Sequence, residues 1–299
     1  MNPVNSEHIN LDRLEFGAQD KNNISLYLLR LDKIHPEISG NKWFKLRFYL
    51  DDAIAENKQT IATLGGAWSN HILATAAACK LNGLHSIGII RGERPHDLSY
   101  TLKKATEYGM NLIFIPRSEY KQKIMPPDLA SREDVYLIDE GGYGEKGMLG
   151  AATIAEFYKQ QKFTHICCAV GTGTMMAGLI KASGPLQQIL GISVLKNNWS
   201  IEKEIKALLG ENGQHIRYSV NHNYHFGGYA KYNDSLIAFM NDFYRHTQVP
   251  TDFVYTAKMV YGVYALLERN FFPPGSRILL IHSGGLQGNN SLLHETLIF

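Results

Sequence analysis

The sequence predicts an α/β protein built on open, twisted parallel sheets with helices on both faces. From Thr60 onward, short apolar runs rich in β-forming residues alternate with helical patterns, and glycines separate them. Strands and helices in that order form parallel sheets covered on both sides. The 299 residues suffice for one large or two medium domains. Because no linker rich in proline and serine divides the chain, two domains would meet at a cleft.

The first unit of this alternation is the apolar run Thr60 to Leu64, which ends at Gly65-Gly66. A helix is predicted to follow it through Leu81, with Ser69 and Asn70 as candidate caps. This strand, glycine turn and helix form the start of a βαβ pattern.

Further apolar runs and helical periods continue the pattern. The strands predicted from apolar runs are His85 to Ile90, Asn111 to Ile115, Val135 to Ile138, His165 to Val170, Ile189 to Leu195 and Arg277 to His282. The predicted helices are one whose apolar face carries Leu98, Leu102 and Ala105, one over about Leu149 to Gln161, one behind the glycine-rich turn that follows Val170, one over Asp234 to Thr247 and one over Ala257 to Glu268. The segment Gly213 to Tyr232 has no clear period and is predicted to carry loops.

Charge and cysteine content exclude several function classes. Thirty Lys and Arg against 28 Asp and Glu leave a net charge of +2, too small for a nucleic-acid or membrane-surface protein. Cys79, Cys167 and Cys168 are too few for a disulfide framework, which indicates a reducing compartment. The polar N-terminus and the lack of an apolar stretch of about 18 residues favour a cytoplasmic protein.

A lysine near the start of a predicted helix is the first candidate for chemistry. The segment Ser39 to Leu46 opens this helix, with Ser39 or Asn41 as its cap. The helix dipole and burial between two aromatic neighbours would both lower the pKa of Lys42, and a partly neutral amine can form a Schiff base. The alternative is a solvated lysine on an amphipathic helix.

Two glycine turns at strand ends are candidate anion sites. The turn Gly65 to His71 offers backbone amides and a hydroxyl for a carboxylate, although it can also be read as an ordinary strand-to-helix turn. The turn Gly171 to Gly178 would cradle a phosphate. Met176 stands where a dinucleotide fingerprint needs glycine, and the ending of a P-loop is absent, so a monophosphate fits best.

Two other motifs point to no chemistry of their own. Ile281 occupies the first glycine position of a nucleophile elbow around Ser283, so the elbow pattern fails. His222 and His225 could ligate a metal, but no H-E-x-x-H pattern accompanies them, and we expect no metal site.

Six motifs in chain order resemble the fold-type II, tryptophan-synthase-β-like enzymes that use pyridoxal 5'-phosphate (PLP). Within this group the sequence is similar to the 1-aminocyclopropane-1-carboxylate deaminase and D-cysteine desulfhydrase family. The motifs are Gly40-Asn41-Lys42 with Lys45-Leu46, Gly65-Gly66 with Ser69-Asn70-His71, Thr172-Gly173-Thr174 with Ala177-Gly178, Gly227-Gly228-Tyr229, Val254-Tyr255-Thr256 with Lys258, and His282-Ser283-Gly284-Gly285.

The resemblance implies a role for each matching residue. Lys42 would hold PLP as a Schiff base and move protons, and Ser69 with two active-site tyrosines would complete the catalytic set. These implied roles are, in full, catalysis for Lys42, Ser69, Tyr229 and Tyr255; cofactor binding for Lys42, Lys45, Asn70, Thr172, Gly173, Thr174, Met175, Thr256 and Ser283; and substrate binding for Trp68, Ser69, Asn70 and His71.

Two hydroxyls indicate which reaction the resemblance implies. Thr256 stands where relatives that open a cyclopropane ring carry glutamate, and Ser283 stands where they carry an apolar residue. Hydroxyl partners make the pyridine ring a weaker electron sink. This favours β-elimination, as in D-cysteine to pyruvate, ammonia and sulfide. The alternatives are deamination of 1-aminocyclopropane-1-carboxylate or another amino acid, racemisation, and amino-acid binding without turnover.

The family layout implies two domains and a homodimer. The large PLP-binding domain would comprise residues 1–47 and 155–299, and residues 48–154 would form a small inserted α/β domain. Phe44 replaces an arginine of many relatives, and Trp68 replaces another residue, so the substrate pocket is expected to differ.

Overall fold

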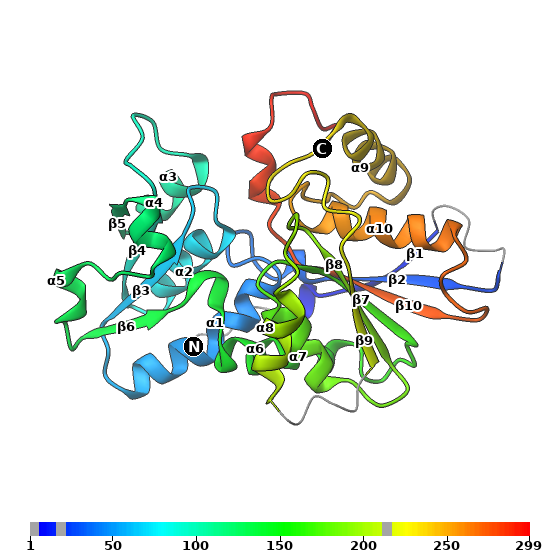
Figure 1. Ribbon diagram of the computed structural model, residues 1–299, viewed down its shortest axis with the longest axis horizontal. Helices are drawn as coiled ribbons and strands as arrows, with labels where there is room; N and C mark the ends of the chain where they lie inside the picture. The colour runs from blue at the N-terminus through cyan, green and yellow to red at the C-terminus, as the bar shows by residue number, and fades with distance from the viewer. Residues whose placement is uncertain (1–5, 16–21, 211–216) are drawn as a thin grey trace.

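The computed structural model describes residues 6–15, 22–210 and 217–299 and contains two β-sheets (Figure 1). The larger sheet has the order β1-β2-β10-β7-β8-β9, and the smaller one the order β5-β4-β3-β6. The strands of the larger sheet are β1 (Leu11–Leu14), β2 (Ser25–Arg30), β7 (His165–Val170), β8 (Gln188–Ser193), β9 (Arg217–Asn221) and β10 (Arg277–His282). Those of the smaller sheet are β3 (Thr60–Gly65), β4 (His85–Arg91), β5 (Met110–Ile115) and β6 (Val135–Ile138).

Among the described residues, all strand pairs but one are parallel, which confirms the predicted fold class. The exception is β1, which pairs antiparallel with β2 at the edge of the larger sheet. β2 pairs in turn with β10, so strands from opposite ends of the chain lie side by side. The central strands β3, β7 and β10 are almost entirely buried, as expected for strands covered on both faces.

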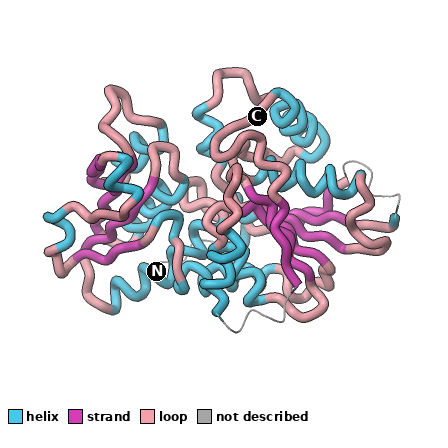
Figure 2. Tube along the Cα trace, in the orientation of Figure 1, coloured by secondary structure: helices cyan, strands magenta, loops and turns pink. Residues whose placement is uncertain are grey.

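The helices cover the sheets and fill the space between them (Figure 2). They are α1 (Asn41–Ala55), α2 (Asn70–Leu81), α3 (Tyr100–Glu107), α4 (Arg117–Lys121), α5 (Pro127–Ala130), α6 (Glu145–Ala152), α7 (Thr174–Ala182), α8 (Ile201–Leu209), α9 (Asp234–Thr247) and α10 (Thr256–Glu268). α6 packs against both α1 and α7. One hydrophobic cluster runs from Ile61 of the smaller sheet through α1 and α6 to Ile166 of the larger sheet, so the two sheets share a core.

The helix predicted over Leu149 to Gln161 is misplaced. α6 begins at Glu145, and a 3₁₀ helix over Thr153–Phe157 follows it. Its glycines permit close packing, since a β-carbon on Gly150 would lie 1.9 Å from the carbonyl oxygen of Phe44 in α1. Glycine weakens an isolated helix, which is why the sequence pattern placed the helix too late.

Two smaller expectations are also wrong, and a third is incomplete. The N-cap of α1 is Gly40, with φ +63°, and neither Ser39 nor Asn41 caps the helix. Leu98 precedes α3 rather than lying on it. The segment Gly213 to Tyr232 contains β9, whose polar and partly exposed residues hide its strand character; residues 213–216 lie outside the described residues.

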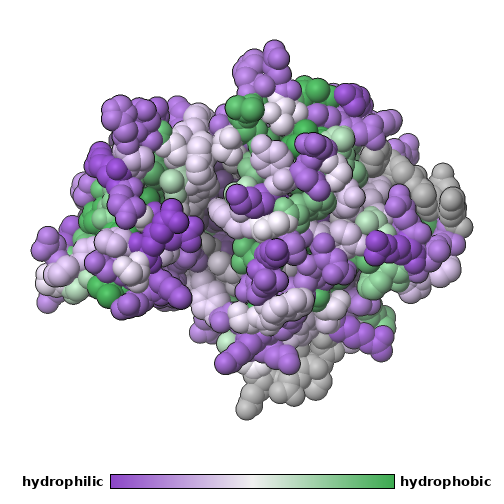
Figure 3. Space-filling view, turned by 45° about the horizontal axis from the view of Figure 1, so that its top comes forward, coloured by the Kyte–Doolittle hydropathy of each residue, from purple (hydrophilic) through white to green (hydrophobic). Residues whose placement is uncertain are grey.

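The surface of the molecule is hollowed between its two halves. Figure 3 shows a mainly hydrophilic face with a hollow between the part built on the smaller sheet and the part built on the larger one. Within the described ranges, no helix is long and apolar enough to cross a membrane. The division into a large domain of residues 1–47 and 155–299 and a small domain of residues 48–154 stays a prediction.

Candidate active site

A cavity of about 540 Å³ opens where strands of both sheets end. The carboxyl ends of β3, β4, β6, β7 and β10 supply its walls, together with the start of α1. Ligands of open α/β sheets bind at such carboxyl edges, and the volume suits a small-molecule site.

The cavity brings together most of the residues that the sequence motifs singled out. Those that line it are Lys42, Lys45, Trp68, Ser69, Asn70, His71, Thr172, Gly173, Met175, Tyr229, Tyr255 and Ser283. Thr174 and Thr256 do not line it. Thr174 is buried, and its hydroxyl lies 3.0 Å from that of Thr172. The contact of these two residues with a cofactor stays a prediction.

Lys42 lies in the first turn of α1 and points into the cavity. Its Nζ donates a hydrogen bond of 3.0 Å to Asn41 Oδ1 and lies 5.9 Å from the centre of the Tyr255 ring. A close backbone contact holds this turn in place, because a β-carbon on Gly40 would lie 1.8 Å from the carbonyl oxygen of Ser283. Only glycine therefore permits α1 to start beside the end of β10.

Burial lowers the pKa of Lys42 to about 8, although the carboxylate of Asp252 opposes this shift. The sequence predicted the direction, and desolvation is the main cause. A lysine with this pKa is partly neutral near physiological pH, so it can act both as a nucleophile and as a base.

Lys45 and the turn after β7 form a site suited to a phosphate. Lys45 is 3% exposed, and burial together with the charge of Lys42 holds its pKa well below the ordinary value. Gly173 caps α7 with φ +77°, so the N-terminal amides of this helix face the same cavity. A buried ammonium next to free helix amides is stabilised by a bound dianion.

The turn between β3 and α2 keeps unpaired polar atoms. Asn70 Oδ1 and His71 Nδ1 are buried and have no hydrogen-bond partner. His71 Nε2 lies 2.9 Å from Thr63 Oγ1, and burial keeps its pKa well below the ordinary value, so its ring is neutral. Unpaired buried polar atoms are costly, which indicates that a ligand completes this turn.

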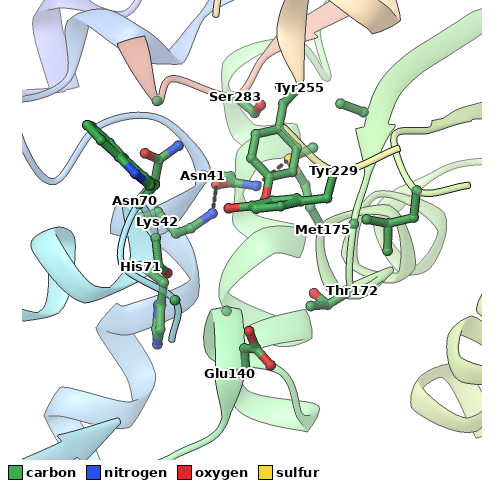
Figure 4. Close-up of a pocket in the computed structure, with 18 of the residues that line it drawn as sticks. Asn41, Lys42, Asn70, His71, Glu140, Thr172, Met175, Tyr229, Tyr255 and Ser283 are labelled. Atoms are coloured by element: carbon green, nitrogen blue, oxygen red, sulfur yellow. Dashed lines mark hydrogen bonds between the residues drawn. The ribbon is translucent and has the colours of Figure 1, made fainter. Parts of the chain in front are cut away.

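Two tyrosines close the cavity opposite this turn. Figure 4 shows Tyr229 and Tyr255 directed toward Lys42, and their ring centres lie 6.2 Å apart in an edge-to-face arrangement. Burial, followed by the neighbouring Tyr229 and Asp252, holds the pKa of Tyr255 well above its ordinary value. Both phenols are therefore protonated donors at neutral pH.

Comparison with known protein families decides the assignment. A family model described as "Pyridoxal-phosphate dependent enzyme" matches residues 8–284. The chain belongs to this family. Accordingly it is a PLP-dependent enzyme, and PLP is its cofactor.

Relatives and solved structures narrow the likeness within the PLP-dependent enzymes. The chain is 29% identical to the mitochondrial bifunctional D-cysteine desulfhydrase/1-aminocyclopropane-1-carboxylate deaminase of Arabidopsis thaliana, over 89% of this chain and 74% of the other. It is 26% identical to a 1-aminocyclopropane-1-carboxylate deaminase of a Bradyrhizobium species, over 85% of this chain and 84% of that protein. The crystal structure of a homologue of 1-aminocyclopropane-1-carboxylate deaminase shares the fold, with 24% identity and a TM-score of 0.82. The match covers 96% of this chain and 92% of the other.

The cavity of this PLP-dependent enzyme fits its cofactor. Lys42 would hold the PLP aldehyde, Lys45 and the amides at the start of α7 would hold the phosphate, and Asn70 carries an unpaired buried oxygen for a ring substituent. We propose these roles for the residues that line the cavity, and they agree with those implied by the motifs.

Sequence reasoning assigned no role to two buried residues that support the site. Asp252 accepts hydrogen bonds from the backbone N–H groups of Val254, Tyr255 and Thr256 at 2.8–3.0 Å. Lys258 is fully buried and donates to the carbonyl oxygens of His225 and Gly228, which ties the loop carrying Tyr229 to α10. An aspartate before a helix start was a visible signal for the first. The second belongs to the motif Val254-Tyr255-Thr256 with Lys258, which implied no role for it.

The lowered pKa of Lys42 predicts how the enzyme takes up its cofactor. The neutral amine attacks the aldehyde, so the rate of PLP capture by the apoenzyme should rise with pH and reach half its maximum near pH 8. An unperturbed lysine would place this midpoint near 10.4. The growth of visible absorbance after mixing measures the rate, with circular dichroism at each pH as the control for folding. A midpoint above pH 10 would contradict the assignment.

Proposed function

We propose that this PLP-dependent enzyme catalyses β-elimination from a small amino acid, with D-cysteine as substrate and pyruvate, ammonia and sulfide as products. The observation that carries the proposal is the hydroxyl-bearing Ser283 in the cavity; Thr256 is buried and does not line it. Ser283 is buried and lines the cavity. Both oxygens of Asp252, the acid close to Thr256, accept backbone hydrogen bonds, so this carboxylate is already engaged by the backbone.

Bound PLP supplies an electron sink for the negative charge that develops at the substrate's α-carbon. Ser283 would offer the pyridine nitrogen a hydroxyl partner, which would keep this sink shallow. A shallow sink is sufficient when a good leaving group departs from the adjacent carbon, which supports elimination over the harder opening of a cyclopropane ring.

The chain's own residues account for the remaining steps. The turn Ser69 to His71 binds the substrate's carboxylate through backbone amides, the Ser69 hydroxyl and the side chain of Asn70. Lys42 Nζ takes the proton from the α-carbon, for which its pKa near 8 is well matched. Tyr229 or Tyr255 donates a proton to the departing sulfur, because both phenols are protonated and face Lys42.

Deamination of 1-aminocyclopropane-1-carboxylate is the second candidate. The names of the relatives favour it, since the Bradyrhizobium protein carries that activity in its name and the Arabidopsis protein carries both. The location in the cytoplasm and the assembly into a homodimer also stay predictions.

The identity of the released keto acid distinguishes the two reactions. With PLP-loaded enzyme, we expect pyruvate from D-cysteine and, at most, slow 2-oxobutanoate from 1-aminocyclopropane-1-carboxylate, with L-cysteine as the stereochemical control. Chromatography of the keto acids after derivatisation gives both products in one assay. Faster release of 2-oxobutanoate than of pyruvate would reject the elimination proposal and establish the deaminase.

A further inference from the structure

Two arginines lie at neighbouring strand ends of the smaller sheet. Arg91 is the last residue of β4, and Arg117 is the first residue of α4, directly behind β5. The two strands are parallel and pair Arg91 with Ile115, so both arginines leave the same edge of the sheet. Both line the active-site cavity.

Neither guanidinium forms an ion pair among the described residues, although Glu140 lines the same cavity. Across residues 6–15, 22–210 and 217–299, no acidic side chain forms an ion pair with either arginine. Arg91 lies over the ring of Tyr120, with 5.7 Å from its guanidinium carbon to the ring centre. A lone guanidinium that is held by a ring contact keeps its donors available for a ligand.

Arg91 lies beside the turn between β3 and α2. Its Nη2 lies 3.6 Å from the position that a β-carbon on Gly66 would take, in the turn that leads to Ser69. Desolvation raises the pKa of Tyr229, the charge of Glu140 adds to this rise, and Arg91 opposes it. Arg91 therefore lies close to the turn proposed to bind the substrate's α-carboxylate, in the cavity that Tyr229 also lines.

Arg91 and Arg117 have no role in the β-elimination proposed above, and the cavity holds an excess of positive charge. Four cationic side chains line it, namely Lys42, Lys45, Arg91 and Arg117, against one carboxylate, that of Glu140. PLP would engage the two lysines, and the uncharged turn Ser69 to His71 would bind the α-carboxylate. Two arginines then face one acid, so this wall stays positive and favours a further anion.

We propose that Arg91 and Arg117 form a subsite for an anionic group carried on the β-carbon of the amino-acid substrate. This inference rests on the proposed β-elimination and defines its substrate class as amino acids with an anionic β-substituent, of which ionised D-cysteine is a small member. In the elimination, the Cα–H and Cβ–substituent bonds break. The proton goes to Lys42, the substituent leaves with the electron pair of its bond, and water converts the remainder to pyruvate and ammonium.

A binding comparison on the PLP-loaded enzyme tests the subsite without turnover. Aspartate and alanine differ by one carboxylate on the β-carbon, and calorimetry gives the dissociation constant of each, for both enantiomers. We expect wild type to bind the preferred enantiomer of aspartate about tenfold more tightly than that of alanine, as one charged hydrogen-bonded contact supplies. In the Arg91→Gln, Arg117→Gln double variant this preference should disappear.

Arg94→Gln is the matched control. Arg94 lies in the loop after Arg91 and stacks on Phe114, but it does not line the cavity, so the preference should persist in this variant. Equal or weaker binding of aspartate than alanine by wild type would overturn the proposal. The same holds for a preference that survives in the double variant.

Turnover provides the second arm and separates this inference from the proposed function. O-phosphoserine should release pyruvate and phosphate, and the double variant should lose kcat/KM for it more than for cysteine. If cysteine and O-phosphoserine both yield no pyruvate while the aspartate preference holds, elimination is rejected and the anion subsite stands. If cysteine yields pyruvate but the aspartate preference is absent, elimination stands and the subsite is rejected.

Discussion

The Lys42→Ala variant should be colourless and inactive. Lys42 is the lysine whose amine points into the cavity at a pKa near 8, so its loss removes both the link to PLP and the base at the α-carbon. Proton transfer by a positioned side chain contributes roughly 100-fold to 10,000-fold to a rate, and we expect at least this loss in kcat.

Lys45→Ala is the control for Lys42→Ala. Lys45 lies one turn further along α1 and faces the same cavity, and we expect it to bind the phosphate. The Lys45 variant should bind PLP more weakly but become yellow at high PLP concentration, whereas Lys42→Ala should stay colourless at any concentration. A yellow Lys42→Ala protein would show that another amine holds the cofactor.

The Asp252→Ala variant should be strongly destabilised. Its carboxylate accepts three backbone hydrogen bonds from Val254, Tyr255 and Thr256 in a fully buried site. Each orphaned buried N–H costs about 1–3 kcal/mol, so the free energy of unfolding should fall by at least about 3 kcal/mol. Urea denaturation of the apoenzyme measures this change.

Asp252→Asn separates the structural role of this carboxylate from its charge. The amide oxygen can keep part of the hydrogen bonding, so the loss of stability should be smaller than in Asp252→Ala. Because the carboxylate raises the pKa of Lys42, its neutralisation should lower that pKa and move the midpoint of PLP capture to lower pH. An unchanged or higher midpoint would contradict the electrostatic role of Asp252.

The sequence was informative where burial decides the structure. β3, β7 and β10 are buried on both faces and appear as continuous apolar runs, so their positions could be predicted within one residue. β9 at the sheet edge is polar and partly exposed, so it gave no such pattern. α6 was misplaced because Gly147 and Gly150 serve close helix packing, which a one-dimensional pattern does not contain.

The site was predictable where motifs carry it and not where the fold assembles it. Lys42, Ser69 and Tyr229 belong to separate motifs, and the cavity brings them together as expected. Arg91 and Arg117 belong to none of the six motifs. They become neighbours only because β4 and β5 pair in parallel, and strand pairing is a property of the folded chain.

Pyruvate release from D-cysteine by PLP-loaded wild type and Lys42→Ala, measured side by side, tests the central claim most directly. The account predicts pyruvate with an equal amount of sulfide from wild type and neither product from the variant. Pyruvate from both proteins, or from neither while 1-aminocyclopropane-1-carboxylate is turned over, would contradict elimination by Lys42 in this cavity.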